Sequence, residues 1–143
     1  MDPVLAVAAE LALARGTRMV EPLELEEACG LDHDGCVTAL VALRDAGSLQ
    51  LALSPSSQIV LVALTDSGVL RYAEEVRADL DAVRRRVADA AAAAVGQGAV
   101  DLADRVGEPA LLVECLLDQW VRERRIVYSR SPGRKFRIHR IER

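Results

Sequence analysis

The sequence contains an internal repeat, and this repeat limits the possible folds more than any other feature. When residues 25–63 are shifted by 77 positions, they align with residues 102–140 without a gap. Solenoid repeats have roughly 20–50 residues, so a shift of this size predicts two similar small domains instead. Positions with core character stay apolar in both copies. The identical pairs are Leu25/Leu102, Gly30/Gly107, Leu40/Leu117, Ser54/Ser131 and Pro55/Pro132.

The pattern of apolar and turn residues predicts the same order of elements in each copy. In the first copy we expect helices over residues 4–14 and 23–29, a third helix ending near residue 46, and strands over 49–53 and 59–64. Cys36, Leu40 and Leu43 form the apolar stripe of the third helix. The second copy repeats this order, with helices over 100–106 and from Pro109 to about 124, and strands over 126–130 and 136–141. The predicted fold is therefore mainly α with two small β-hairpins.

A long helix is predicted between the two copies. Apolar residues over 66–95 alternate in steps of four and three, which is typical of a heptad seam. This seam either packs within the chain or pairs with a second chain, and we favour the homodimer. The predicted organisation is a first unit over 1–75, a connecting helix over 66–95 shared by both units, and a second unit over 81–143. The seam residues are Val69, Ala73, Val76, Leu80, Val83, Val87, Ala90 and Ala94.

This order of elements resembles the winged helix-turn-helix superfamily, arranged in tandem. The resemblance covers segments 23–30, 36–47 and 49–64, and their counterparts 100–107, 113–124 and 126–141. It implies a third helix that enters the DNA major groove and a hairpin, or wing, that contacts the backbone. The same fold also serves protein contacts, and tandem winged-helix subunits that bind kleisin chains are similar in outline. The resemblance alone therefore does not decide the function.

Neither third helix has the side chains that read bases. Base edges are usually read by Arg, Lys, Asn or Gln. The third helix of the first copy is expected to present aspartates and valines outward. The third helix of the second copy is expected to present mainly acidic and apolar residues. The outward residues predicted are Asp34, Val37, Thr38, Val41 and Asp45 in the first copy, and Leu111, Glu114, Cys115, Asp118 and Arg122 in the second.

The first hairpin has no charged residue between Ser48 and Leu64. Val60 and Val62 alternate with Ile59 and Leu61, so both faces of this strand are apolar. Such a strand is normally covered on both faces. The cover is either the rest of the chain or a protein partner. The predicted protein interface consists of Val37, Val41, Val60 and Val62, together with the seam residues Val76, Leu80 and Val83.

The second hairpin is strongly basic. Residues 1–75 hold 4 basic and 12 acidic residues, whereas the last 25 residues hold 9 basic and 2 acidic ones. A cationic wing suits contacts to phosphates, which set affinity and position but not sequence. A solvated strand edge and an acidic protein partner, such as the first half of another copy, are the alternatives. The predicted phosphate contacts are Arg122, Arg125, Arg130, Arg134, Lys135 and Arg137.

Other functional classes receive little support from the sequence. An aromatic content of 3% argues against binding of single strands by base stacking. Cys29, His33 and Cys36 lack the paired spacing of a zinc site, and the two cysteines fall on core positions of the repeat, so no metal is predicted. We find no catalytic constellation and expect neither an enzyme nor a cofactor. Arg84, Arg85 and Arg86 are expected to form a solvated face.

The start of the chain has no basic region typical of a signal peptide, and no apolar run reaches the roughly 18 residues of a membrane span. We therefore expect a cytoplasmic protein. The function that the sequence favours is binding of double-stranded DNA by a transcriptional regulator, through the second wing. The alternative is a tandem winged-helix adaptor that binds proteins and does not itself contact nucleic acid.

Overall fold

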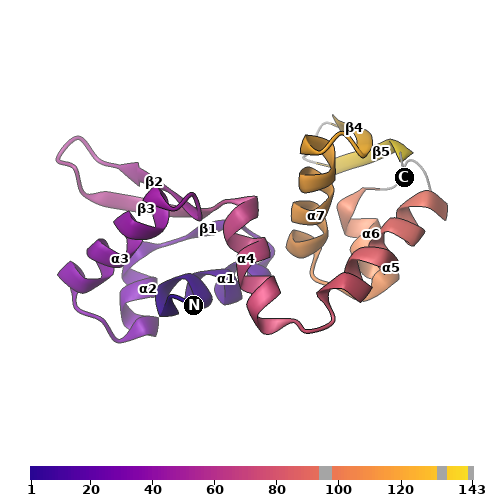
Figure 1. Cartoon of the computed structure of the whole chain (residues 1–143). Coiled ribbons are helices and arrows are strands. Elements are labelled where there is room, and N and C mark those ends of the chain that lie inside the picture. Colours follow the sequence, from indigo (N-terminus) through magenta and orange to yellow (C-terminus); the bar gives the residue numbers. More distant parts are fainter. Residues whose placement is uncertain (94–97, 132–134, 142–143) are drawn as a thin grey trace. The chain divides into compact units, whose positions relative to one another are not determined.

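The computed structural model describes the backbone of residues 1–93, 98–131 and 135–141, and the side chains of these residues up to position 125. The chain divides into two compact units, Met1–Val76 and Arg77–Arg143. The elements of each unit are labelled in Figure 1. No helix among the described residues has both the length and the apolar character that crossing a membrane requires.

The first unit is mainly helical, with a small three-stranded antiparallel sheet, and is consistent with a winged-helix fold. The strands lie in the order β1-β3-β2, so β3 is central. The sequence predicts α1, α2, α3 and the β2–β3 hairpin, but not β1, which has only two residues. The elements are α1 (Pro3–Arg15), β1 (Met19–Val20), α2 (Pro22–Cys29), α3 (His33–Asp45), β2 (Leu49–Leu53), β3 (Ile59–Leu64) and α4 (Asp66–Val76).

Local signals in the sequence set the helix ends of this unit. The Asp2 carboxylate accepts a hydrogen bond from the Val4 amide at 2.8 Å, which caps α1. The Asp32 carboxylate accepts one from the Gly35 amide at 2.7 Å, which caps α3. Gly30 ends α2 with a φ of 67°, in the left-handed region that glycine adopts without strain. The predicted end of α2 at residue 29 is confirmed.

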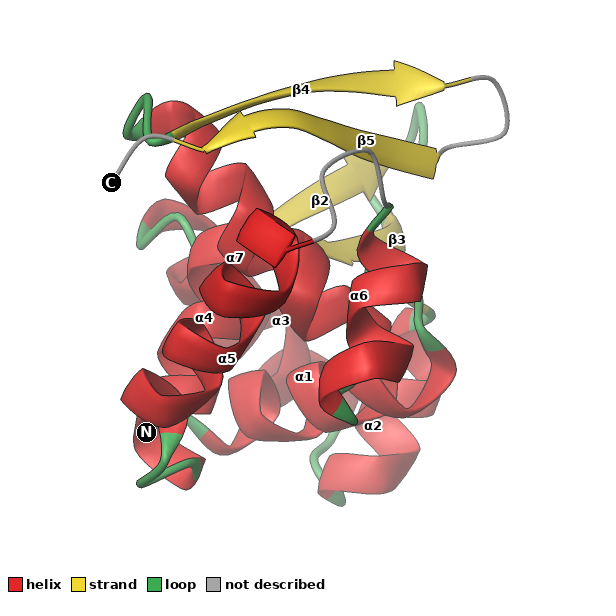
Figure 2. Cartoon of the chain, turned by 90° about the vertical axis from the view of Figure 1, so that its right-hand side faces the viewer, coloured by secondary structure: helices red, strands yellow, loops and turns green. Residues whose placement is uncertain are grey.

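Within its described residues, the second unit has three helices and a two-stranded antiparallel sheet, the pair β4–β5, which Figure 2 shows in yellow. The bounds of α6 and α7 are those of α2 and α3 shifted by 77 residues. Leu25 and Leu102 are both fully buried. Gly47 and Arg124, also 77 positions apart, both have a positive φ. The elements are α5 (Leu80–Ala93), α6 (Ala99–Val106), α7 (Ala110–Arg122), β4 (Ile126–Ser131) and β5 (Lys135–Ile141).

The predicted connecting helix over 66–95 is wrong. The helix α4 ends at Val76 and α5 begins at Leu80, with three residues between them. The heptad seam is divided accordingly, because Val69 and Ala73 are buried in the first unit and Leu80, Val83 and Val87 in the second. Each half of the stripe therefore faces the core of its own unit, and no continuous seam is left for a coiled coil. Of the other seam positions, Ala94 lies outside the described residues.

Candidate nucleic-acid interface

The β4–β5 hairpin carries most of the predicted phosphate contacts. Ser129 pairs with Arg137 and Ser131 with Lys135, whereas Arg130 pairs with Phe136. Cross-strand partners belong to the same face of a hairpin. The positions of Lys135 and Arg137 therefore share one face, and Arg130 belongs to the other. Arg134 lies outside the described residues.

The base of this hairpin is basic as well. Arg122 is exposed in the last turn of α7. The Arg125 guanidinium lies 5.6 Å from the centre of the Trp120 ring, within the range of a cation–π contact. It also lies 3.7 Å from the Glu123 carboxylate. Because the Arg125 side chain is 55% exposed, the indole holds the guanidinium without removing it from solvent.

The helix that precedes this wing, α7, is more buried than its sequence predicts. Leu111 and Cys115 were predicted to face outward, but they are 3% and 0% exposed. The apolar residues of α7 extend beyond the single stripe of Val113, Leu117 and Trp120 and bury more than one face of the helix. Of the other residues predicted outward, Glu114 and Asp118 are half-buried. Carboxylates repel phosphates, so α7 offers no face suited to reading bases.

The corresponding helix of the first unit, α3, is exposed but acidic. Asp34, Thr38 and Asp45 are exposed, as predicted. The Thr38 hydroxyl donates to the Asp34 carbonyl oxygen at 2.9 Å, so it is engaged with the helix backbone. Val37 and Val41 are half-buried on the same helix. This surface is also unsuited to the negatively charged groove of DNA.

The predicted protein interface is divided between surface and core. Val60 and Val76 are 54% and 51% exposed. Val62, Leu80 and Val83 are buried, so their assignment to an interface is wrong. Val62 lies on the central strand, paired with Val20 on one side and Leu51 on the other, which places it in the core of the first unit.

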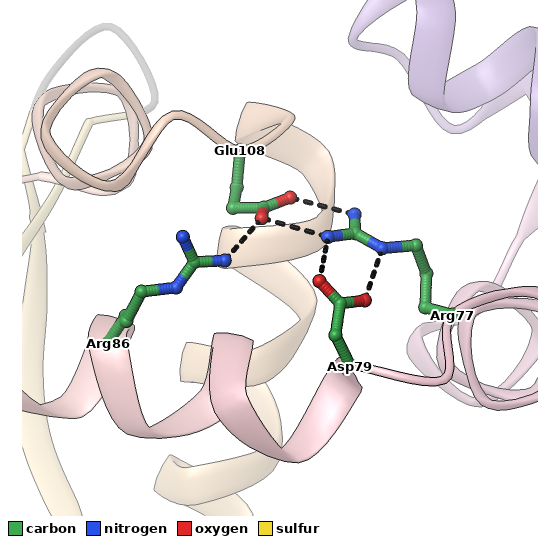
Figure 3. Close-up of polar contacts among 4 residues, drawn as sticks. All are labelled: Arg77, Asp79, Arg86 and Glu108. Carbon is green, nitrogen blue, oxygen red and sulfur yellow. Dashed lines mark hydrogen bonds and ion pairs between the residues drawn. The ribbon is translucent and has the colours of Figure 1, made fainter.

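An ion-pair network in the second unit was not foreseen (Figure 3). Glu108, in the turn between α6 and α7, accepts hydrogen bonds from both terminal nitrogens of Arg77, at 2.8 and 2.9 Å, and from Arg86 at 2.9 Å. Arg77 also donates to Asp79 at 2.9 and 3.1 Å. Arg86 was expected in a solvated face, and its side chain is indeed half exposed, but its head group binds Glu108.

The network changes the titration of its members. The Glu108 carboxylate is 6% exposed. Its hydrogen bonds to Arg77, followed by the nearby charges of Arg77 and Arg86, outweigh desolvation and lower the pKa of Glu108. Hydrogen bonding to Arg77 lowers the pKa of Asp79 in the same way, and the pKa of Arg77 is raised. The partners of Glu108 lie 31 and 22 residues away, so no local sequence pattern indicates the network.

The cysteines and the nearby histidine serve packing and surface contacts. Cys36 is buried on α3, as its position in the repeat predicted, and Cys29 is half-buried. Burial raises the pKa of both thiols, which disfavours the thiolate that binds metals. His33 pairs through Nδ1 with the Glu26 carboxylate at 2.6 Å. Within the described ranges, no group of three His, Cys, Asp or Glu side chains is placed to hold a metal ion.

Solved structures that are similar to this chain include a transcriptional regulator. No protein-family model and no curated protein matches the chain. Among solved structures, the PcaV transcriptional regulator from Streptomyces coelicolor, in complex with its natural ligand, is 25% identical. The match covers 64% of this chain and 76% of PcaV, with a TM-score of 0.37. A TM-score of this size supports no functional argument, so the inferences below depend on the chain's own residues.

Proposed function

We propose that the chain is a DNA-binding regulator made of two winged-helix units, and that it contacts duplex phosphates through the wing β4–β5. The observation that carries the proposal is the register of this hairpin. It assigns Lys135 and Arg137 to one face, next to Ser129 and Ser131. Cations and hydroxyl groups are the side chains that commonly bind phosphate oxygens.

The first wing has uncharged residues at the positions that correspond to these cations. Shifted by 77 residues, Leu53, Gln58 and Val60 correspond to Arg130, Lys135 and Arg137. All three positions of the first wing are exposed. Two apolar residues and a glutamine of the first wing are thus replaced by cations in the second. The register shift falls between Ala52 and Leu53 in the first wing and between Val127 and Tyr128 in the second, so the correspondence is one of sequence and not of each ladder pair.

The rest of the molecule indicates binding that depends little on sequence. The unit Met1–Val76 contains 12 acidic and 4 basic residues, and α3 exposes Asp34 and Asp45. The second helix-turn-helix segment ends in α7, whose surface is largely buried. Phosphate contacts without base contacts give affinity and register but little discrimination between sequences. Sequence preference would then require a partner protein.

The test measures the affinity of a short duplex of arbitrary sequence by fluorescence anisotropy. The variant K135Q/R137Q removes two charges from the wing. The control R44Q/R71Q removes two charges from exposed positions of the first unit, so the net charge is the same. We expect the wing variant to bind roughly ten- to a hundredfold more weakly, because a loss of about 1.4 kcal/mol is tenfold in affinity. Equal weakening by both variants would contradict the assignment to the wing.

A protein adaptor is the second candidate function, and the first wing favours it. Leu53 and Val60 are about half exposed, in a hairpin without charged residues. Large exposed apolar patches often mark a protein contact, and this hairpin presents two exposed apolar side chains. The adaptor replaces the DNA-binding proposal if the wild-type chain binds no duplex even at low salt.

A further inference from the structure

The first wing has an open strand edge at β2. Among the described strands, β2 pairs with β3 alone. The Thr65 amide donates to the Ser48 carbonyl oxygen at 3.1 Å, which fixes the hydrogen-bonding phase of the ladder. In an antiparallel pair, every second residue of a strand forms hydrogen bonds to the neighbouring strand. Gln50 and Ala52 therefore bond to β3, and the N–H and C=O groups of Leu49 and Leu51 point away from β3, toward the open edge. These outward groups can accept another strand.

A groove lies beside this edge. It has a volume of about 610 Å³, is open to solvent, and is lined in part by the first residues of β2. Its walls combine the end of α3, the start of β2 and the residue before α4. The lining residues are Arg44, Gly47, Leu49, Gln50, Leu51 and Thr65. Space for an extended segment is therefore present where the backbone groups are open.

The charge distribution of the first unit favours a second copy of this chain as the occupant of this groove. In a two-fold symmetric contact the same surface of both copies meets itself. The first unit carries eight more acidic than basic residues, and none of its charges lies between Ser48 and Leu64. Edge strands are normally protected by charged residues or proline, and β2, with the sequence Leu-Gln-Leu-Ala-Leu, has neither. The hairpin is thus the part of an acidic unit that a second copy can approach without repulsion.

We propose that β2 of one chain pairs antiparallel with β2 of a second copy, and that this contact forms a homodimer. A two-fold axis at Leu51 places Leu53 of the second copy opposite Leu49, against the groove. The Leu53 side chain is 51% exposed in the single chain, and the contact removes it from water. The contact joins the two sheets by main-chain hydrogen bonds, and it is independent of DNA binding by the second wing.

Sedimentation velocity of the full chain at several concentrations tests this proposal. Leu53→Glu introduces a charge at the edge, and Leu51→Pro removes an outward N–H that the ladder to β3 does not use. Leu23→Glu is the matched control, because Leu23 is 73% exposed on α2 and the charge change is the same. Circular dichroism shows whether each variant is folded.

We expect the wild type and Leu23→Glu to form dimers with similar dissociation constants. Leu53→Glu raises the dissociation constant at least about tenfold, as a loss of roughly 1.4 kcal/mol requires, and folded Leu51→Pro does the same. If Leu51→Pro does not fold, Leu53→Glu decides alone. A wild type that stays monomeric at all concentrations overturns the proposal. A dimer that Leu53→Glu weakens no more than Leu23→Glu also overturns it.

Discussion

At the scale of single residues, Glu108 links three segments of the second unit. Its carboxylate joins the segment before α5, the helix α5 itself and the turn between α6 and α7, through Arg77 and Arg86. A carboxylate that is only 6% exposed loses much of its hydration on folding. The three charge-assisted hydrogen bonds offset that loss. The network therefore ties the turn between α6 and α7 to α5 and to the segment before α5.

Replacing Glu108 tests this role. Glu108→Gln keeps the shape but loses the charge, and we expect it to lower the free energy of unfolding by about 1–2 kcal/mol at neutral pH, since hydrogen bonds to charged groups contribute roughly that much. Urea unfolding measures the change. Asp81→Asn is the control: it alters the exposed pair with Arg84, and we expect an effect below about 0.5 kcal/mol.

The same variant has a defined pH dependence. Because the pKa of folded Glu108 lies below its ordinary value of 4.5, the unfolded chain takes up this proton first as the pH falls. The stabilisation by Glu108 is thus complete at neutral pH and is lost on acidification from about 4.5 through the folded pKa. The stability difference between wild type and Glu108→Gln should shrink over this range. A difference that stays constant would show that the charge of Glu108 does not contribute.

At the scale of elements, the junction of α3, β2 and α4 shapes the first wing. The Thr65 hydroxyl donates to the Gly47 carbonyl oxygen at 2.7 Å and accepts from the Gly68 amide at 3.1 Å, so it caps α4 and holds the start of β2. Gly68 lies against the backbone of Ser48, and a Cβ at this position would overlap the Ser48 carbonyl oxygen. The close approach of α4 to β2 therefore requires glycine.

Gly68→Ala should destabilise the first unit. Alanine favours helices in general, but here the methyl group meets a backbone atom that cannot move aside. We expect a loss of about 1–3 kcal/mol, the usual cost of overpacking, measured by thermal unfolding. Ser67→Ala, one residue earlier and exposed, should leave stability unchanged or slightly raised. Equal stability of the two variants would mean that the junction relaxes freely.

Local signals explain which elements were predictable. The strands β2 and β3 were predicted with the observed bounds, because an uncharged run interrupted by Ser54-Pro55-Ser56-Ser57 is typical of a hairpin. The break after Val76 was missed, because the spacing of apolar residues is the same in one long helix and in two helices that follow each other. The contact between Arg77 and Glu108 spans 31 residues, so periodicity does not report it.

At the scale of the whole molecule, charge divides the chain. The unit Met1–Val76 has eight more acidic than basic residues, and the unit Arg77–Arg143 has four more basic than acidic ones. The sequence was sufficient to find this contrast and the basic wing. It was not sufficient to predict which residues of that wing share a face. The faces depend on the register shift between Val127 and Tyr128, which only the pairing of the two strands shows. Nor did it reveal that Val62 and Leu111 are buried.

Binding of an arbitrary duplex at two salt concentrations tests the central claim most directly. If the wing β4–β5 neutralises phosphates, the logarithm of the affinity falls steeply with the logarithm of salt, by about 0.9 for each phosphate bound. In K135Q/R137Q this slope should be shallower by roughly one for each phosphate that is no longer neutralised, and in R44Q/R71Q it should match the wild type. Absence of binding at low salt, or one slope shared by all three proteins, would contradict the claim.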